Sequence, residues 1–502
     1  MAERRPSSDT VLFTVLLALH LIPIWVFPYF PTQDGPMHVG NARMLQEYFR
    51  TDGAVVRQYL SLTPHIEDNW PGHLALVALF QLFAPLTAEK VLLSCYVLLF
   101  ALCARWTIAA FGRSSLFLAV LLFPFIYNFT LHMGFYNFSF SLIVWIYTLG
   151  YWLRHCDTWQ GKRTAILALL LTITYFLHPV SFVMAVVLLM FLAATLPSGP
   201  RPLWRLYCVG LASLPGSLLL LHFRLTHDSA APVWTLPFDQ KLRYFFTLGC
   251  LRSFGRPEVA LCLLFLLLLG VTAAVSRRAT SGRGWRPEQA LATLAGLCTV
   301  VYLVAPDEIG QGSFMAARLM FFPLILTLLW LAARSYSLLA TRVVRAAGTA
   351  VVVLWLGFHA FQHASVQARL DEYLAAARLM RPGATLLAVH RRPPREWYFD
   401  PVANISGYYA AERNLVALDN YEAATDHFPL RFRAPCDPAS LTGRLSSVTL
   451  QKYNSLDGCG VDYIVLFGDL AADLQLALSE YRAIASSPTP GLWQLFERAP
   501  GR

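Results

Sequence analysis

The sequence predicts an α-helical polytopic membrane protein with about 11 transmembrane helices and a small C-terminal extracytoplasmic α/β domain. Of its 502 residues, 56% are hydrophobic and only 14% are charged, and the mean hydropathy is +0.49. A soluble core cannot bury that much apolar surface. Apolar runs recur as far as residue 363, after which the composition becomes that of a soluble domain.

The first apolar run, Val11–Phe30, is long enough to cross the roughly 30 Å hydrocarbon core of a bilayer. It follows a short polar start that carries Arg4 and Arg5, and it ends in Phe-Pro-Tyr-Phe-Pro without a small-residue cleavage site. These features predict an uncleaved first helix whose N-terminus is cytoplasmic.

A polar first loop, residues 31–90, follows this helix. Within it, Gln33–Phe49 has the pattern of an amphipathic helix, with Asp34 and His38 one turn apart near its start. The later apolar segment Leu74–Pro85 has only about a dozen residues, which favours a helix lying on the membrane surface over a span.

Ten further spans are predicted between residues 91 and 363. Residues 165–196 form one long apolar stretch interrupted by His178-Pro179, which fits either a kinked helix or, as the charge pattern favours, two short spans. The predicted spans are 91–111, 115–131, 138–153, 164–177, 180–196, 205–223, 257–275, 288–305, 314–333 and 343–363.

Basic residues in alternate loops set the predicted orientation in the inner (plasma) membrane. The loops that would be cytoplasmic contain Arg113; Arg154, Lys162 and Arg163; Arg201 and Arg205; Arg277, Arg278, Arg283 and Arg286; and Arg334, Arg342 and Arg345. This asymmetry is the positive-inside pattern, so the net charge of +10 indicates membrane orientation and not nucleic-acid binding. The first loop and the C-terminal domain would then both be extracytoplasmic.

The C-terminal domain, residues 364–502, is predicted to be α/β. Strand patterns occur at Thr385–Val389, Leu415–Leu418, Val461–Phe467 and Leu492–Glu497, and a helix is predicted over Asp469–Ala483. Cys436 and Cys459 lie in this polar region and would form a disulfide in an oxidising compartment, or otherwise remain free thiols.

Ionisable residues gather on the predicted outer side of the membrane. Such groups at the ends of apolar helices are costly unless paired or hydrated, so their clustering predicts a functional site; ordinary solvated loops are the alternative. The residues are Asp34, His38, His65, Glu67, Asp68, His132, His178, Asp307 and Glu308.

Short patterns in the first loop resemble those of the bacterial GT-C glycosyltransferases. The patterns are an early Asp after the first span, Trp70-Pro-Gly-His-Leu74, Phe80-Gln-Leu-Phe83 and Glu89-Lys90. The resemblance covers residues 1–363 and implies a multi-pass enzyme that takes a sugar from a polyprenyl phosphate, with Asp34 as catalytic base or metal ligand. The acidic pair of the family is replaced here by Asp34-Gly35, and its Pro-Pro-Leu by Pro71-Gly72-His73-Leu74.

Transfer from a sugar phosphoryl lipid requires a base for the acceptor and a positive charge for the departing phosphate. We expect Asp34 to be the base, with a helix N-cap as its alternative role. His38 would share a divalent cation with Asp34, bind substrate, or pack as an ordinary polar residue. Arg318, about one turn inside a late span, would bind the lipid phosphate or extend to the headgroups.

Four other residues are expected to line the substrate cavity or simply to form polar turns: His132, His178, Asp307 and Glu308. The last two would orient Arg318 or bind the sugar. No phosphate-binding Gly loop, Cys/His zinc spacing or nucleophile elbow occurs in the sequence. A divalent metal ion, with Asp34 and His38 as candidate ligands, is a candidate cofactor.

The expected function is sugar transfer from a polyprenyl-phosphate donor to an extracytoplasmic acceptor, namely a cell-envelope glycan, lipid or protein. Membrane lipids would be further partners. One alternative is a transporter or flippase for a lipid-linked substrate, although neither repeated halves nor carboxylates in the middle of a span are evident. Another is a non-catalytic membrane scaffold with the same fold, in which Asp34 would be replaceable.

Overall fold

The chain folds into two compact units, each described here by itself. Unit 1 comprises Met1–Pro23 and Ser94–Phe361, and unit 2 comprises Ile24–Leu93 and Gln362–Arg502. The computed structural model describes residues 8–65, 67–158, 160–196, 201–226, 233–277, 287–309, 312–391, 397–425, 428–442 and 445–499.

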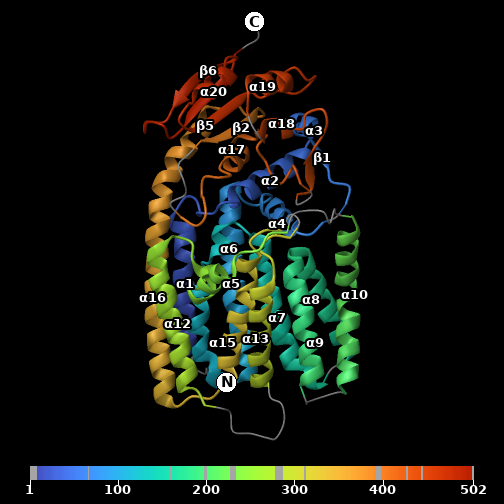
Figure 1. The fold of residues 1–502 in the computed structure, drawn as a ribbon, viewed down its shortest axis with the longest axis vertical. Helices are drawn as coiled ribbons and strands as arrows, with labels where there is room; N and C mark the ends of the chain where they lie inside the picture. Colours follow the sequence, from blue (N-terminus) through green and yellow to red (C-terminus); the bar gives the residue numbers. More distant parts are fainter. Residues whose placement is uncertain are drawn as a thin grey trace. The chain divides into compact units, whose positions relative to one another are not determined.

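Unit 1 is helical, and each of the eleven predicted spans falls on helix (Figure 1). The long helices that lie wholly or partly in it are α1 (Ser8–Val26), α5 (Pro85–Ile108), α7 (Tyr136–His155), α8 (Gly161–Leu177), α9 (Pro179–Thr195), α10 (Pro202–Thr226), α12 (Arg256–Val275), α13 (Pro287–Val304), α15 (Phe321–Ala332) and α16 (Leu338–Leu374). Shorter elements are η1 (Ala109–Phe111), η2 (Arg113–Phe125), α6 (Phe129–His132), η3 (Cys156–Thr158), α11 (Phe238–Phe246), η4 (Gly249–Leu251) and α14 (Met315–Leu319).

Within the described residues, eight helical segments are long and apolar enough to cross a membrane, compared with about eleven predicted. The remaining three predicted spans correspond to α7, α8 and α9. Helices α8 and α9 have 17 residues each, at the lower end of the length range for a span. Helix α7 begins with the polar residues Asn137, Ser139 and Ser141, which lower its apolar character.

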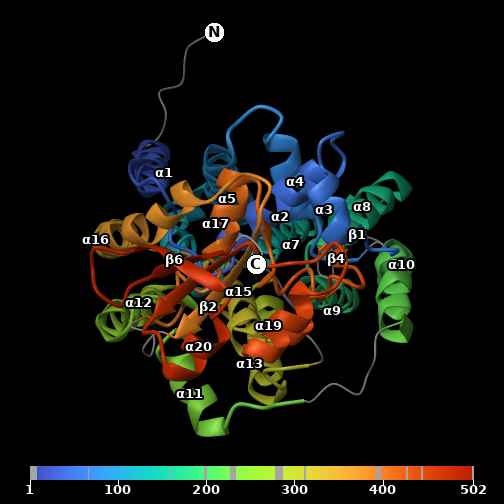
Figure 2. The same ribbon diagram turned by 90° about the horizontal axis from the view of Figure 1, so that it is seen from above.

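Two of the eight candidate spans are enclosed by the others. Residues 113–132 and 315–332 have 89% and 83% of their most apolar window buried, whereas the other six have 28–50% buried. Figure 2 shows α15 surrounded by the other helices of the unit, and α8, α9 and α10 side by side. The predicted span 115–131 begins within η2, whose thirteen residues, 113–125, adopt the narrower 3₁₀ conformation.

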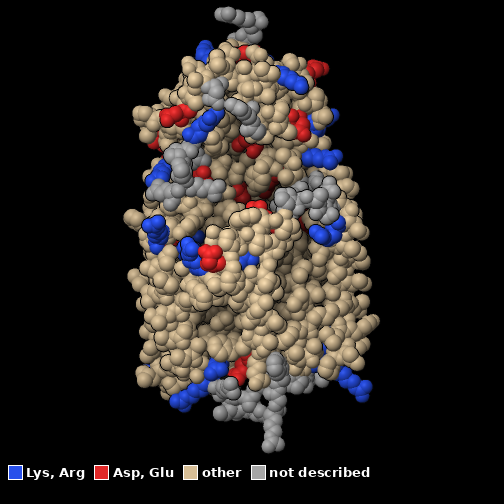
Figure 3. All heavy atoms as spheres, in the orientation of Figure 1, with Lys and Arg blue, Asp and Glu red and all other residues tan. Residues whose placement is uncertain are grey.

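The outer surface of unit 1 is apolar. Leu169, Leu218 and Leu267, on three different helices, are 57–63% exposed, and Figure 3 shows a broad belt almost free of charge with Lys and Arg at its edges. Such a surface suits lipid and not water. The long apolar helices therefore indicate a multi-pass membrane protein. Among the predicted cytoplasmic basic residues, Arg278, Arg283 and Arg286 lie outside the described residues, as do Arg4 and Arg5.

Unit 2 contains a mixed five-stranded sheet in the order β3-β2-β5-β7-β6. Strand β2 (Thr385–Arg391) is parallel to β3 (Val416–Ala417) and β5 (Tyr463–Gly468), whereas β7 (Gln494–Arg498) is antiparallel to β5 and to β6 (Tyr481–Ser486). The four strands predicted from sequence are thus present. The helices of the C-terminal region are η5 (Ala375–Leu379), α17 (Ser406–Arg413), α18 (Ala439–Thr442), α19 (Ser447–Asn454) and α20 (Ala472–Ala477).

The helix predicted over Asp469–Ala483 is wrong in its second half. The helix α20 ends at Ala477, and β6 begins at Tyr481. Strand β6 pairs with β7 from Tyr481 opposite Arg498 onwards, and Tyr481 packs into the hydrophobic core. Pairing with a neighbouring strand therefore outweighs the local helix preference of this segment.

The first loop belongs to the same unit as the C-terminal region. It contributes α2 (Gly35–Tyr48), α3 (Ala54–Tyr59), β1 (Leu60–Leu62) and α4 (Pro71–Leu79), and β1 pairs antiparallel with β4 (Leu430–Phe432). Helix α2 crosses α17 where Gly40 meets Gly407; a Cβ on Gly407 would lie 2.2 Å from the carbonyl oxygen of Pro36. A disulfide also joins Cys436 and Cys459 in this unit.

Candidate functional site

Asp34 lies at the N-cap position of α2, directly after the first apolar helix. Its backbone oxygen accepts a hydrogen bond from the amide of His38 at 3.0 Å, but its side chain does not cap the helix. Instead, the Asn404 side-chain amide donates to the Asp34 carboxylate at 2.8 Å. Asp34 is only 8% exposed, so its carboxylate is held within unit 2 and is not a solvated cap.

The surroundings of Asp34 oppose its ionisation. Burial raises the pKa of the Asp34 carboxyl to about 6; the neighbouring His38 acts to lower it, and Glu422 adds to the increase. The hydroxyl of Tyr421 lies between the carboxylates of Asp34 and Glu422, and burial together with those two charges raises its pKa well above the usual range. Asp34 is therefore a carboxylate that exchanges its proton near neutral pH.

His38 is part of a buried cluster with two residues that sequence analysis did not select. Its Nδ1 atom lies 3.1 Å from Nε2 of His73 and 3.1 Å from the Oε1 atom of Glu422. The Nε2 atom of His73 lies 3.0 Å from Oε2 of Glu422. His38, His73 and Glu422 are 9%, 1% and 4% exposed, and their candidate ligand atoms all lie within 4.8 Å of one another. We call these three residues the His-His-Glu cluster.

Two asparagines hold the carboxylate of this cluster. Asn41, one turn after His38 on α2, donates from its side-chain amide to Oε2 of Glu422. Asn420 donates to the side-chain oxygen of Asn41 at 2.6 Å and accepts from the backbone amide of Glu422 at 3.1 Å. Although burial acts to raise it, the two histidines hold the pKa of the Glu422 carboxyl well below its usual range.

In unit 1, the structure brings together two of the predicted site residues, Arg318 and His178. The Nη1 atom of Arg318 lies 2.8 Å from Nε2 of His178, and the guanidinium stands 4.4 Å from the centre of the Phe135 ring. Arg318 sits on the short helix α14 and is partly buried. The imidazole and the aromatic face therefore both contact the guanidinium.

Asp307 accepts hydrogen bonds from the first residues of α14, the helix that carries Arg318. Its Oδ1 atom accepts from the backbone amide of Ala316 at 2.7 Å, and its backbone oxygen accepts from Met315 at 3.0 Å. The carboxylate thus caps the start of α14 and fixes the position of the helix. The neighbouring Glu308 is exposed and forms a backbone bridge with Trp234.

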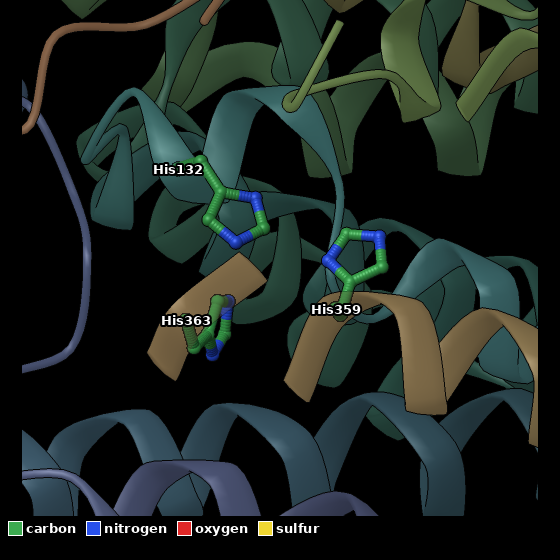
Figure 4. A group of neighbouring side chains, drawn as sticks. All are labelled: His132, His359 and His363. Carbon is green, nitrogen blue, oxygen red and sulfur yellow. The ribbon is translucent and has the colours of Figure 1, made fainter. Parts of the chain in front are cut away.

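His132 lies in a different, fully buried part of unit 1. Its Nδ1 atom is 2.9 Å from both the Asn128 carbonyl oxygen and the Ser253 hydroxyl, and its ring stacks on His359 with centroids 5.4 Å apart. The Nε2 atom of His359 in turn lies 3.0 Å from Glu258. Figure 4 shows His132 of α6 beside His359 of α16, with His363 one turn further along α16.

The seven predicted site residues therefore belong to both units: Asp34 and His38 lie in unit 2, and the other five in unit 1. Sequence analysis missed His73 and Glu422 in unit 2 and the buried pair Glu258 and His359 in unit 1. His359 left a signal, because it is ionisable within a predicted span. Glu422 left none, because it is 349 positions from His73.

No protein-family model matches this chain, and a search of curated proteins finds no match. The function is therefore inferred from the side chains themselves.

Proposed function

We propose that this chain is an integral membrane glycosyltransferase that moves a sugar from a polyprenyl-phosphate donor to an acceptor hydroxyl or amine. The acceptor would belong to a cell-envelope glycan, lipid or protein. In this proposal Asp34 is the general base. Two features support this proposal: the multi-pass helical unit, and the buried Asp34 carboxyl of the first loop, whose pKa is raised toward neutral pH.

The state of the Asp34 carboxylate is the observation that carries this proposal. A base is most effective when its pKa lies near the working pH, because it is then largely ionised yet still basic enough to take a proton. The pKa of about 6 meets that condition. The hydrogen bond from Asn404 fixes the orientation of the carboxylate, which supports a role in which one oxygen receives the proton.

The reaction requires one bond to form and one to break. The acceptor oxygen or nitrogen attacks the anomeric carbon and gives its proton to Asp34, while the bond from that carbon to the phosphate oxygen breaks. The electron pair leaves with the polyprenyl phosphate. Positive charge near the phosphate lowers the barrier. As a separate proposal about unit 1, Arg318 is a candidate for binding phosphate, because its fork of donors suits phosphate oxygens.

The direct test measures transfer of radiolabelled sugar from polyprenyl-phosphate donors by purified protein in lipid nanodiscs. We expect Asp34→Asn to lower the rate by at least about 100-fold, which is the usual contribution of a general base, with a nearly unchanged unfolding midpoint at pH 4. Glu412→Gln is the matched control, because Glu412 is another unit 2 carboxyl with a raised pKa but lies outside the site. Full activity of Asp34→Asn would remove Asp34 from the mechanism.

One observation favours the second candidate, a transporter of a lipid-linked substrate. Glu258 and His359 are fully buried and 3.0 Å apart in unit 1, so this helical unit does contain a buried ionisable pair of the kind used in proton-coupled transport. The backbone amide of Phe254 donates to Glu258 at 2.7 Å, which also gives the carboxylate a structural role. Transport predicts that the donor crosses the bilayer with its sugar-phosphate bond intact, whereas transfer predicts release of free polyprenyl phosphate.

A further inference from the structure

We infer that the His-His-Glu cluster, His38, His73 and Glu422, is a binding site for one divalent first-row transition-metal ion. This inference is independent of the proposed sugar transfer, because it concerns what the cluster binds and not which reaction follows. It also differs from the sequence-based expectation of a cation shared by Asp34 and His38, since the ligands are now two imidazoles and one carboxylate.

The spacing of the three side chains fits a shared metal ion. Their facing nitrogen and oxygen atoms are 3.0–3.1 Å apart. For metal–ligand bonds of about 2.0–2.2 Å, neighbouring ligand atoms are about 3.3–3.6 Å apart in a tetrahedron and about 2.8–3.1 Å apart in an octahedron. A metal ion bound by the two nitrogens and the Glu422 carboxylate therefore requires shifts of only a few tenths of an ångström.

The ligand types select the class of metal. Imidazole nitrogens suit Zn²⁺, Fe²⁺, Co²⁺ and Ni²⁺, whereas Mg²⁺ and Ca²⁺ prefer sites made of oxygen ligands. Two histidines and one carboxylate occur in both zinc and non-haem iron sites, with further coordination positions left for water or substrate. The cluster therefore predicts a transition metal and not the hard cations that a pair of carboxylates would favour.

Asn41 and Asn420 support Glu422 as outer residues support the ligands of known metal sites. Carboxylate ligands in such sites are fixed by outer hydrogen bonds, whose loss commonly weakens metal binding 10- to 100-fold. Here Asn41 donates to Glu422 and is itself held by Asn420. Asn41 is completely buried, so this support comes from the protein interior and not from solvent.

A bound ion would also connect segments that are far apart in the sequence. His38 lies in the first turn of α2, His73 in the first turn of α4, and Glu422 in the loop between β3 and β4. Binding by the folded protein alone raises the free energy of unfolding with the logarithm of the metal concentration relative to the dissociation constant. We therefore expect metal loading to raise the unfolding temperature of the full-length protein.

The test begins with full-length protein stripped by chelator and then titrated separately with Zn²⁺, Fe²⁺, Mn²⁺ and Mg²⁺, with no sugar donor present. Elemental analysis after removal of free ion should find about one transition metal per chain and no Mg²⁺. His73→Gln and Glu422→Gln should lose the metal, and Asn41→Ala should bind at least tenfold more weakly. His390→Gln, an exposed histidine of the same unit, and His132→Gln, from unit 1, should bind as wild type does.

X-ray absorption spectroscopy of the wild-type protein keeps the test decisive if a variant fails to fold. We expect a first shell of nitrogen and oxygen atoms with the scattering of two imidazole rings. Three outcomes would overturn the inference: no transition metal bound at micromolar concentration, a spectrum without two imidazoles, or metal that stays in His73→Gln and leaves in His132→Gln. None of these outcomes depends on whether sugar is transferred.

Discussion

The Asp34 carboxylate is balanced between its neutral and charged forms because burial and hydrogen bonding act in opposite directions. Burial raises its pKa to about 6, whereas the amide of Asn404 stabilises the ionised carboxylate. An Asp in water has a pKa near 3.9. The residue thus combines the basicity needed for catalysis with a defined orientation.

The proposed base should be visible in the pH dependence of sugar transfer. Because Asp34 acts when ionised, we expect kcat/KM to rise as pH increases through about 6 and then level off. Asn404→Ala removes a donor to the ionised form, so the rise should move to higher pH by about one unit. The measurement is kcat/KM from pH 4.5 to 8.5 after chelation, because a neighbouring cation would lower this pKa. A profile unchanged by Asn404→Ala would contradict the assignment.

The same pKa shift makes a prediction about stability. A carboxyl whose pKa is raised on folding binds its proton more tightly in the folded state, so its contribution to stability falls as pH rises from about 4 to about 6. Asp34→Asn removes this cost, and we expect it to stabilise the protein by about 2–3 kcal/mol at pH 8 and by little at pH 4.

Denaturant unfolding of the wild type and Asp34→Asn at pH 4 and pH 8 measures this difference in the free energy of unfolding. If Asp34→Asn changed the free energy of unfolding equally at pH 4 and pH 8, the pKa of the Asp34 carboxyl would not be raised by folding. The same two measurements on Glu412→Gln, which removes another unit 2 carboxyl with a raised pKa, provide the comparison.

At the scale of single elements, the crossing of α2 and α17 holds the first loop in place. Gly40 and Gly407 allow the two backbones to approach so closely that a Cβ on Gly407 would lie 2.2 Å from a backbone oxygen. Backbone cannot move aside as a flexible side chain can. The position of Asp34 and His38, at the start of α2, therefore depends on a residue that touches neither of them.

We expect Gly407→Ala to destabilise unit 2 by about 2–3 kcal/mol or to displace α2, with loss of both activity and metal binding. Gly357→Ala is the matched control, because Gly357 is also helical but has open space around it, and alanine favours helix by about 1 kcal/mol. Thermal unfolding of the two variants measures the difference. A neutral Gly407→Ala would mean that the helices are less closely packed than described.

Sequence patterns predicted the elements whose structure is determined locally. Each long apolar run became a helix, and the amphipathic pattern of residues 33–49 became α2. The 3₁₀ conformation of η2 was not predicted; η2 packs closely against distant residues such as Gly348, whose Cβ would lie 2.9 Å from Val120, and such contacts are not visible in the local sequence. Strand β6 was missed for a similar reason, since its partner β7 decides its conformation.

At the scale of the whole molecule, the decisive contacts join residues that are distant in sequence. Residues 24–93 share a unit with residues 362–502, and the three-residue strands β1 and β4 pair across about 370 positions. Such short strands leave no signal of their own. Asp34 and His38 could be selected because they are adjacent in one loop, whereas Glu422 could be recognised only after folding.

The orientation in the membrane remains a prediction from the basic loops. We expect tags at the N- and C-termini to lie on opposite sides of the membrane, with the N-terminus cytoplasmic, as the eleven spans predicted from the sequence require. Accessibility of the tags in intact and permeabilised cells measures this. The Cys436–Cys459 disulfide offers a second readout, because it should be oxidised in cells only if unit 2 faces an oxidising compartment. A cytoplasmic C-terminus would overturn the orientation.

The central claim is that the protein makes a new glycosidic bond. Identification of the product that the wild-type protein forms tests this claim most directly. Proteoliposomes containing a polyprenyl-phosphate sugar labelled in both sugar and phosphate would be supplied with a membrane extract as the source of acceptor. The account predicts one labelled acceptor for each polyprenyl phosphate released, and release at least about 100-fold slower with Asp34→Asn. Movement of the intact donor across the bilayer, without release of polyprenyl phosphate, would contradict the account and identify a transporter.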